Sequence, residues 1–344
     1  MPADPNEKPQ SGTVGGEEAL IAEFWAPLAA GFAGAFDLKD DCATIAPPAG
    51  EELVVTTDAL IAGVHFFPGD DPAAVGWKAL AVNVSDLVGK GAMPLAYLMN
   101  VALPGLDRAW LAAFTNGLRA AQVAFGCQLI GGDTDRTPGP LTVSITALGT
   151  APSGRMVRRA TARPGDHVYI TGTIGDAAIG LALRKDPHVL DRAGLDKAAA
   201  SYLEGRFSRP HPPVAIVPAL RACASAAMDV SDGLIKDFDR LCRASGVGGV
   251  IEASVVSLSE AARSVVDRGE AKLEDLLTGG EDYEVLACVA PDAATEFERL
   301  AAESGVRVTR IGTIVDEPVG GTARSATGES IVFTKTGWDH FSQH

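Results

Sequence analysis

Apolar residues recur along this chain at two spacings, one typical of helices and one typical of strands. In the first 150 residues the helical spacing predicts helices over residues 20–36, 72–88 and 107–125. Asp71 followed by Pro72 is typical of a helix start, and Gly126 of a helix end. Shorter apolar or alternating runs predict strands over residues 53–57, 95–103, 128–130 and 141–148.

The same mixture restarts after a run of turn-forming residues, Ala151-Pro152-Ser153-Gly154, which is the best candidate for a domain boundary. Strands are expected over residues 167–171, 226–230, 283–289 and 306–315. Helices are expected over residues 176–184 and 293–302, and a third one follows Leu234. The chain is therefore divided into a tail (1–17), a first α/β domain (18–150) and a second α/β domain (151–344), a size at which each domain can bury its own core.

Composition narrows the class of protein. Hydrophobic residues make up 47% of the 344 residues and charged residues 21%, which is ordinary for a globular protein. The formal net charge of −15 disfavours nucleic acid and anionic membranes as partners. No apolar run reaches the roughly 18–20 residues of a membrane span. The five cysteines are scattered without a CxxC pair, which predicts reduced thiols in a cytoplasmic protein.

The first 17 residues are rich in Pro, Glu, Gly and Ser and contain no apolar segment. This composition predicts a disordered tail rather than a signal peptide.

Carboxylates recur at the ends of the apolar runs, each beside Gly, Ser or Thr. Such ends suit Mg²⁺, which takes oxygen ligands, keeps several waters and lets carboxylates lie next to phosphates. The pattern predicts metal-assisted handling of a phosphorylated substrate, most simply a nucleotide. Six clusters carry it: Asp40-Asp41, Thr56-Thr57-Asp58, Ser85-Asp86, Gly131-Gly132-Asp133-Thr134, Asp229-Val230-Ser231-Asp232-Gly233 and Gly279-Gly280-Glu281-Asp282.

Each cluster also has a simpler interpretation. Asp58 and Asp133 could each form an Asx turn. Ser231 or Asp232 could cap the helix that follows, although a helix N-terminus is equally a phosphate site. Asp86, which lies against the dipole near the end of its predicted helix, could pair with Lys90 four residues on or with a metal ion.

Two further features remain open between structure and function. Arg159 belongs to the basic cluster of an otherwise acidic chain, which is either a solvated linker or a contact for nucleotide phosphate. His65 is either a structural histidine or, seven residues after Asp58, a group placed over a substrate.

Known nucleotide-binding signatures are missing from the sequence. There is no G-x-x-x-x-G-K-[ST], no H-R-D or D-F-G set, and only a partial dinucleotide fingerprint at residues 171–175. A P-loop enzyme, a protein kinase and a Rossmann dehydrogenase are therefore disfavoured.

Taken in order, the motifs resemble the thiamine-monophosphate kinase family of the aminoimidazole ribonucleotide synthetase-like superfamily. The resemblance runs from about residue 20 to the C-terminus and is specific as an ordered set. One departure is Lys39, which stands where the family usually has glycine before the paired aspartates. The matching segments are Asp40-Asp41-Cys42-Ala43, Thr56-Thr57-Asp58, Gly63-Val64-His65-Phe66, Lys78-Ala79-Leu80-Ala81-Val82-Asn83-Val84-Ser85-Asp86-Leu87, Leu129-Ile130-Gly131-Gly132-Asp133-Thr134, Asp229-Val230-Ser231-Asp232-Gly233-Leu234, Thr278-Gly279-Gly280-Glu281-Asp282-Tyr283-Glu284 and Gly337-Trp338-Asp339-His340-Phe341.

The resemblance implies an α+β fold of two domains, each a mixed sheet with helices on one side. It implies direct transfer of the γ-phosphoryl of ATP to thiamine monophosphate, giving thiamine diphosphate in the last step of its biosynthesis, with several Mg²⁺ ions. The residues it implies are Asp41, Thr56, Thr57, Asp58, Asp86, Asp133, Asp229 and Asp232 for metal, with Asp133 and Asp232 catalytic; Gly132, Asp133, Arg159 and Ser231 for ATP; and His65, Glu281 and Trp338 for thiamine monophosphate.

The resemblance also implies a homodimer in which two sheets of the first domain close into a barrel. The sequence agrees, because the strand runs that hold Val54, Thr56, Met99, Val101, Val143 and Ile145 are apolar enough to need cover on both faces.

Two other functions remain possible interpretations of the motifs. One is another enzyme of the superfamily, such as selenophosphate synthetase, although no Cys precedes Cys42. The other is a non-catalytic nucleotide or metal sensor on the same fold.

Overall fold

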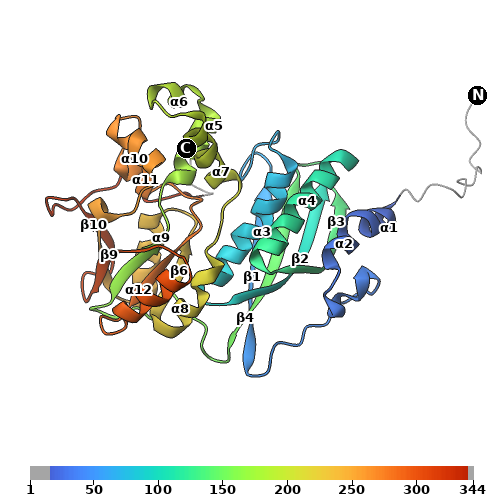
Figure 1. The fold of residues 1–344 in the computed structure, drawn as a ribbon, viewed down its shortest axis with the longest axis horizontal. Helices are drawn as coiled ribbons and strands as arrows, with labels where there is room; N and C mark the ends of the chain where they lie inside the picture. The colour runs from blue at the N-terminus through green and yellow to red at the C-terminus, as the bar shows by residue number, and fades with distance from the viewer. Residues whose placement is uncertain (1–15, 340–344) are drawn as a thin grey trace, which may run out of the picture.

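The structure, a computed structural model, describes residues 16–339. The predicted disordered tail, apart from its last two residues, lies outside the described residues, as do the last five residues of the chain. The chain forms two sheets that lie side by side, each with its own helices (Figure 1). Within residues 16–339, no helix is both long enough and apolar enough to cross a bilayer.

The first sheet has four strands in the order β1-β4-β2-β3 and is mixed, because β2 and β3 run parallel while the other pairs are antiparallel. Two helices pack on one face of it, and one of them, α3, is buried along nearly its whole length. As predicted, Asp71 caps α3 by accepting a hydrogen bond from the Ala73 N–H, and Gly126 ends α4 in the left-handed conformation. The elements are β1 (Glu51–Ile61), α3 (Pro72–Gly89), β2 (Met93–Leu103), α4 (Arg108–Phe125), β3 (Gln128–Arg136) and β4 (Thr142–Pro152).

Before the sheet, the single helix expected over residues 20–36 is broken into short turns. Gly31 has φ +97°, a left-handed conformation that interrupts the helix. The turns are α1 (Glu17–Leu20), η1 (Ile21–Trp25), α2 (Ala26–Ala29) and η2 (Ala33–Leu38).

The two faces of the first sheet differ in cover. Alternation along the strands places Val54, Met99, Val101, Val143 and Ile145 on the helical face, where all five are buried. The opposite face carries exposed apolar side chains instead: Leu53 (37% exposed), Val55 (58%) and Leu98 (38%). The residues used to predict a dimer therefore face the helices, and their neighbours form the open face.

The second sheet has six strands in the order β10-β7-β9-β5-β8-β6 and is also mixed. Every residue of β8 is buried, and alternate residues join two different apolar clusters. Helix α9 covers one face, and α8 and α12 lie on the other. The expectation of helices on one side thus describes the first sheet only, because the second has apolar residues on both faces. Its strands are β5 (His167–Thr171), β6 (Ala224–Val230), β7 (Gly248–Glu252), β8 (Glu284–Val289), β9 (Val308–Val315) and β10 (Gly320–Arg324).

Five helices of the second half, α5, α6, α7, α10 and α11, form an apolar cluster of their own beside this sheet. Helix α3 contacts β6 and β8, so it is shared by both halves of the molecule. The helices of the second half are α5 (Asp176–Lys185), α6 (His188–Arg192), α7 (Lys197–Ser208), η3 (Val214–Ile216), α8 (Val217–Cys223), α9 (Leu234–Ser245), η4 (Ala253–Val255), α10 (Glu260–Asp267), α11 (Leu273–Leu277) and α12 (Ala294–Glu303).

Two strands are longer than expected, and this changes where the aspartates lie. Asp58 and Asp133, which were expected at strand ends, lie inside β1 and β3. Gly and Asp have low strand propensity, so the sequence pattern ended both strands too early. Both are the edge strands of the sheet, where such residues are tolerated.

Candidate active site

Four predicted aspartates meet where α3 passes between the two sheets. Asp58 comes from β1, Asp86 from the last turn of α3, Asp229 from β6 and Asp232 from the turn before α9. Gly89 makes the approach possible, since a Cβ there would lie 2.7 Å from the backbone nitrogen of Asp229. The fold thus brings together carboxylates that are up to 174 residues apart in sequence (58 to 232).

Hydrogen bonds fix the orientation of several of these groups. The Thr56 hydroxyl donates to Asp86 Oδ2 at 2.5 Å, and the Ser85 hydroxyl donates to Asp229 Oδ2 at 2.8 Å. The side chain of Asn83 accepts from the backbone N–H of Asp58 at 2.9 Å. Three polar residues near the end of α3, Asn83, Ser85 and Asp86, are therefore hydrogen-bonded to the residues around them.

The electrostatics of the cluster are those of an anionic site with too little positive charge. Burial, together with the charges of Asp86 and Asp232, raises the pKa of Asp58 to about 6. Burial and the charge of Asp86 raise the pKa of Asp229 well above its usual range. Each shift shows that ionisation is unfavourable here without a compensating cation.

Lys90 is a partly buried cation close to Asp86 and Asp229. Its ammonium donates to the Ala227 carbonyl oxygen at 2.6 Å. Burial lowers its pKa to about 8, the charges of Asp229 and Asp86 oppose this, and the charge of Arg159 adds to it. Lys90 is therefore close enough to Asp86, Asp229 and Arg159 to feel the charge of each.

The donor set suits a hard cation, although the cluster is not a closed metal cage. Among residues 16–339, no three His, Cys, Asp or Glu side chains are grouped closely enough to hold an ion by themselves. Mg²⁺ needs no such cage, because it binds through one or two carboxylates and completes its shell with water and substrate phosphate. The residues therefore fit Mg²⁺ bound together with a phosphorylated ligand.

Two other predicted ligands lie elsewhere. Asp41 and Asp133 line a separate cavity of about 580 Å³, together with Gly132. The strand register runs from Asp58 through Ile145 and Met99 to Gly132, across three strand spacings. This puts Asp58 and Gly132 roughly 14 Å apart. Within one chain, Asp41 and Asp133 are therefore not brought to the Asp58 cluster.

The paired threonines of β1 also point to different faces. Thr56 faces Asp86, as described above. The Thr57 hydroxyl donates to the Ile145 carbonyl oxygen at 3.0 Å and accepts a hydrogen bond from Thr146. Thr57 is thus on the open face of the sheet, away from the Asp86 side.

The turn before α9 connects the cluster with the predicted substrate residues. The Ser231 carbonyl oxygen accepts from the Glu281 N–H at 2.8 Å, and the Asp232 carbonyl oxygen accepts from the Trp338 N–H at 2.9 Å. Asp232 also forms an ion pair with Arg240 at 2.6 Å. The expectation that Ser231 or Asp232 caps α9 is wrong, because Gly233 is at the N-cap position. The backbone N–H groups of Ser231 and Asp232 instead donate to the carboxylate of Asp237 inside the helix.

His65 and Glu281 are joined by a residue that sequence analysis did not select. The Lys78 ammonium lies 2.5 Å from Glu281 Oε2 and donates to the His65 carbonyl oxygen at 2.9 Å. The available signal was a single lysine inside the apolar run of residues 74–82. Asn83 was missed as well, and Lys90 was considered only as a partner of Asp86.

Comparisons with known proteins identify the family of the chain. The chain matches the family model for the N-terminal domain of AIR synthase related proteins over residues 39–151, and the model for their C-terminal domain over residues 163–323. It is 39% identical to thiamine-monophosphate kinase of Salmonella typhimurium over 89% of this chain and 91% of that protein. It is 38% identical to the same kinase of Caulobacter vibrioides over 93% and 89%.

Solved structures show the same likeness. Thiamine-monophosphate kinase from Stenotrophomonas maltophilia superposes with a TM-score of 0.77 at 38% identity, covering 86% of this chain and 91% of that one. AaThiL in complex with AMPPCP and TMP gives 0.74 at 31% identity, covering 88% and 91%. From both family models and these identities, the chain belongs to the thiamine-monophosphate kinase family of AIR synthase related proteins.

Proposed function

We propose that this protein transfers the γ-phosphoryl group of ATP directly to thiamine monophosphate, giving thiamine diphosphate and ADP, with Mg²⁺. The observation that carries the proposal is the cluster of Asp58, Asp86, Asp229 and Asp232, which borders the loops of Glu281 and Trp338. A metal-suited acidic site next to the predicted substrate residues fits a reaction between two phosphorylated compounds. The relative solved with AMPPCP and TMP supports the same pair of substrates.

Phosphoryl transfer requires that the two substrates be positioned and that their negative charge be neutralised. The attacking group is already a phosphate oxygen, so no strong general base is required. Bound Mg²⁺ would supply positive charge that neutralises phosphate charge. Asp58, Asp86, Asp229 and Asp232 would hold it, with the Thr56 hydroxyl orienting Asp86.

Basic groups are also available for phosphate. Lys90 is close to two acids of the cluster and to Arg159, and both basic side chains would contact the polyphosphate. Ser231 would offer its hydroxyl to the nucleotide from the turn before α9.

The substrate residues remain proposals. Trp338 is 41% exposed beside the Asp232 turn, where it would stack on the cationic thiazolium. His65 and Glu281 would contact thiamine monophosphate from the other side of that turn. Asp41, Gly132 and Asp133 are proposed to act at the cavity beside β3, with Asp41 and Asp133 as metal ligands. Thr57 is proposed as a metal ligand from the open face of β1.

A turnover assay tests the function. We expect thiamine diphosphate to form from ATP and thiamine monophosphate in the presence of Mg²⁺, and to stop forming in excess EDTA, because the buried carboxylates require a cation. Product would be followed by chromatography. No product with Mg²⁺ would refute the kinase activity, whereas unchanged turnover in EDTA would refute the metal requirement alone.

We also propose a homodimer through the open face of the first sheet, where Leu53, Val55 and Leu98 are exposed. Light scattering is expected to give twice the chain mass of 35.5 kDa. Val55→Asp should shift the protein toward monomer, because a charge would be buried at the interface. The matched control is Val123→Asp, at a valine of α4 that is 82% exposed. A monomer mass for the wild type, or equal behaviour of both variants, contradicts this dimer.

We infer a cytoplasmic setting. The five cysteines of the chain are free thiols in the structure, including the exposed Cys42. Free thiols persist where the compartment is reducing. The net charge of −15 argues for small anionic substrates delivered with cations and against nucleic acid or an anionic membrane as a partner.

A further inference from the structure

Lys78 is a charged side chain in the buried interior of α3. The residue is 1% exposed and is flanked along the helix by apolar residues. Lysine is almost never fully buried unless its charge is paired. The partners that hold Lys78 there therefore indicate what it does.

Its ammonium group joins three separate segments of the chain. Nζ lies 2.5 Å from Oε2 of Glu281, in the loop after α11, and donates to the carbonyl oxygen of His65, in the turn after β1, at 2.9 Å. The same nitrogen lies 3.9 Å from the ring centroid of Phe207, on α7, which is a cation–π contact. One residue of the first domain thus fixes two loops and a helix.

Glu281 is held in an unusual conformation at this point. Its φ of +75° is uncommon for a residue other than glycine, so the surrounding structure must maintain it. Its N–H donates to Ser231, while the buried Oε2 has no hydrogen bond among the residues that the structure describes. The charge of Lys78 is therefore what stabilises that oxygen. The side chain keeps 23% of its surface exposed and can meet a ligand on its other side.

The His65 turn is fixed through its backbone. The His65 N–H donates to the Ile61 carbonyl oxygen at 3.0 Å, and its Nδ1 accepts from the Ile61 N–H at 3.0 Å. Lys78 adds a third restraint on this turn through the carbonyl oxygen. The imidazole and the Glu281 carboxylate are thus set relative to each other by one ammonium group.

We propose that Lys78 is a positioning residue for thiamine monophosphate, and this rests on the function proposed above. It holds the Glu281 carboxylate and the His65 turn in the arrangement that binds the thiamine part of the acceptor, and it touches neither ATP nor the acidic cluster. A purely structural ion pair would instead support the whole junction of the two halves. The kinetics of the two substrates separate these roles.

The test combines three variants with two readouts. Lys78→Met keeps the length of the side chain and removes its charge. We expect it to raise KM for thiamine monophosphate at least about tenfold, the usual scale for losing a hydrogen-bonded charge, and to change KM for ATP less than about threefold. Hydrogen–deuterium exchange should increase in residues 278–283 and 62–67.

Because an unpaired buried carboxylate can prevent folding, the double variant Lys78→Met/Glu281→Gln is measured with Glu281→Gln alone. If Lys78 acts through Glu281, removing it from the Glu281→Gln protein should have little further effect on KM for thiamine monophosphate. An equally large effect in both backgrounds, with unchanged exchange in residues 62–67, would overturn the proposal.

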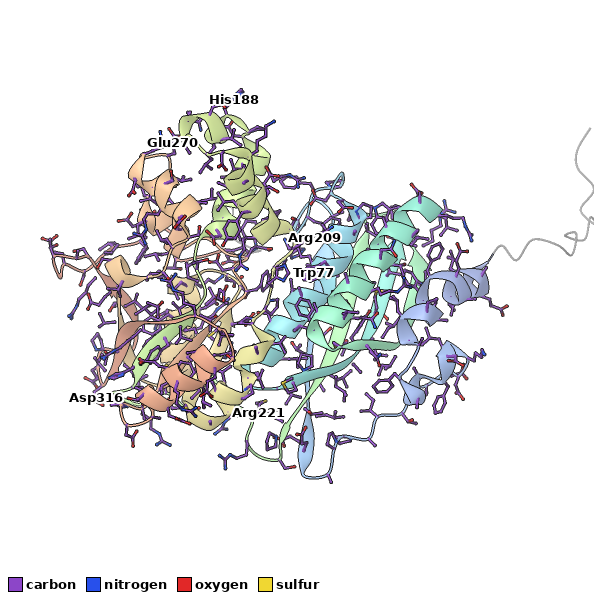
Figure 2. The ribbon with its side chains drawn as sticks, in the orientation of Figure 1. Trp77, His188, Arg209, Arg221, Glu270 and Asp316 are labelled. Atoms are coloured by element: carbon purple, nitrogen blue, oxygen red, sulfur yellow. The ribbon has the colours of Figure 1, made fainter. Side chains whose placement is uncertain are left out.

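The matched control is Arg209→Gln, which breaks another contact between the halves. Arg209 pairs with Asp71 at the start of α3, at 2.8 Å, and lies near Trp77 at the junction of the two halves (Figure 2). It should leave both KM values and the exchange of residues 278–283 unchanged. If Lys78→Met alters both substrates alike, as a loosened junction would, the positioning role is wrong. If the wild type makes no thiamine diphosphate, the proposed function fails, and the exchange data still decide whether Lys78 orders the two loops.

Discussion

Asp232→Asn is expected to lower kcat about 100-fold or more while leaving the protein folded. Asp232 lies in the turn that joins the acidic cluster to the Glu281 and Trp338 loops, and its charge contributes to the raised pKa of Asp58. If it neutralises transition-state charge through Mg²⁺, the amide cannot replace it, and losses of this kind are on the order of 10²-fold or more. Steady-state kinetics at saturating Mg²⁺ would measure the loss.

A control on α9, the helix that follows Asp232, separates an effect on chemistry from an effect on structure. Asp239 also pairs with an arginine, Arg243, at 2.6 Å, and accepts a hydrogen bond from the Gly321 N–H. Asp239→Asn keeps that acceptor and should change kcat less than about twofold. Near wild-type turnover for Asp232→Asn would exclude a role in catalysis, and Asp232 would then only shape the turn and form ion pairs.

Asp133→Asn extends this prediction to the second acidic group. It should lower kcat on the same scale, although Asp133 lies roughly 14 Å from the Asp58 cluster within one chain by strand spacing. A loss of that size would mean that the β3 cavity takes part in the reaction. Unchanged kcat would restrict the site to the cluster around Asp86 and Asp229.

Local signals in the sequence were enough for much of the fold. Asp71-Pro72 correctly predicted the start of α3, and Gly126 correctly predicted the end of α4. Both signals are local, because helix capping depends on residues next to the helix end. Strand length was predicted less well, since Asp58 and Asp133 continue β1 and β3 through pairing with distant strands. The division at residues 150 and 151 stays a prediction.

The candidate site shows the same limit. The ordered motifs named the carboxylates, yet spacing in sequence does not tell which of them meet across two sheets. Asp58 and Asp229 approach through α3, whereas Asp133 is held away by two intervening strands. Lys78 was missed because its partners, Glu281 and His65, are brought to it only by tertiary packing.

Gly132→Ala is expected to destabilise the first domain by about 3 kcal/mol or more. Gly132 has φ +152° inside β3, and a Cβ there would lie 1.8 Å from the carbonyl oxygen of Met99 on the neighbouring strand. Neither the backbone conformation nor the strand spacing can relax without breaking the ladder between β2 and β3. Urea unfolding followed by circular dichroism would measure the shift of the midpoint.

The adjacent Gly131→Ala is the matched control. A Cβ at Gly131 would meet only the Cδ2 of Leu98, at 3.1 Å, which is the movable end of a side chain. Gly131→Ala should lower the free energy of unfolding by less than about 1 kcal/mol. The reason is that Leu98 can change rotamer and that alanine replaces a flexible glycine within a strand. Equal midpoints for the two variants would show that β3 accommodates a side chain at Gly132. Glycine at this position would then be explained by contact with ATP and not by folding, and KM for ATP of Gly132→Ala would measure that contact.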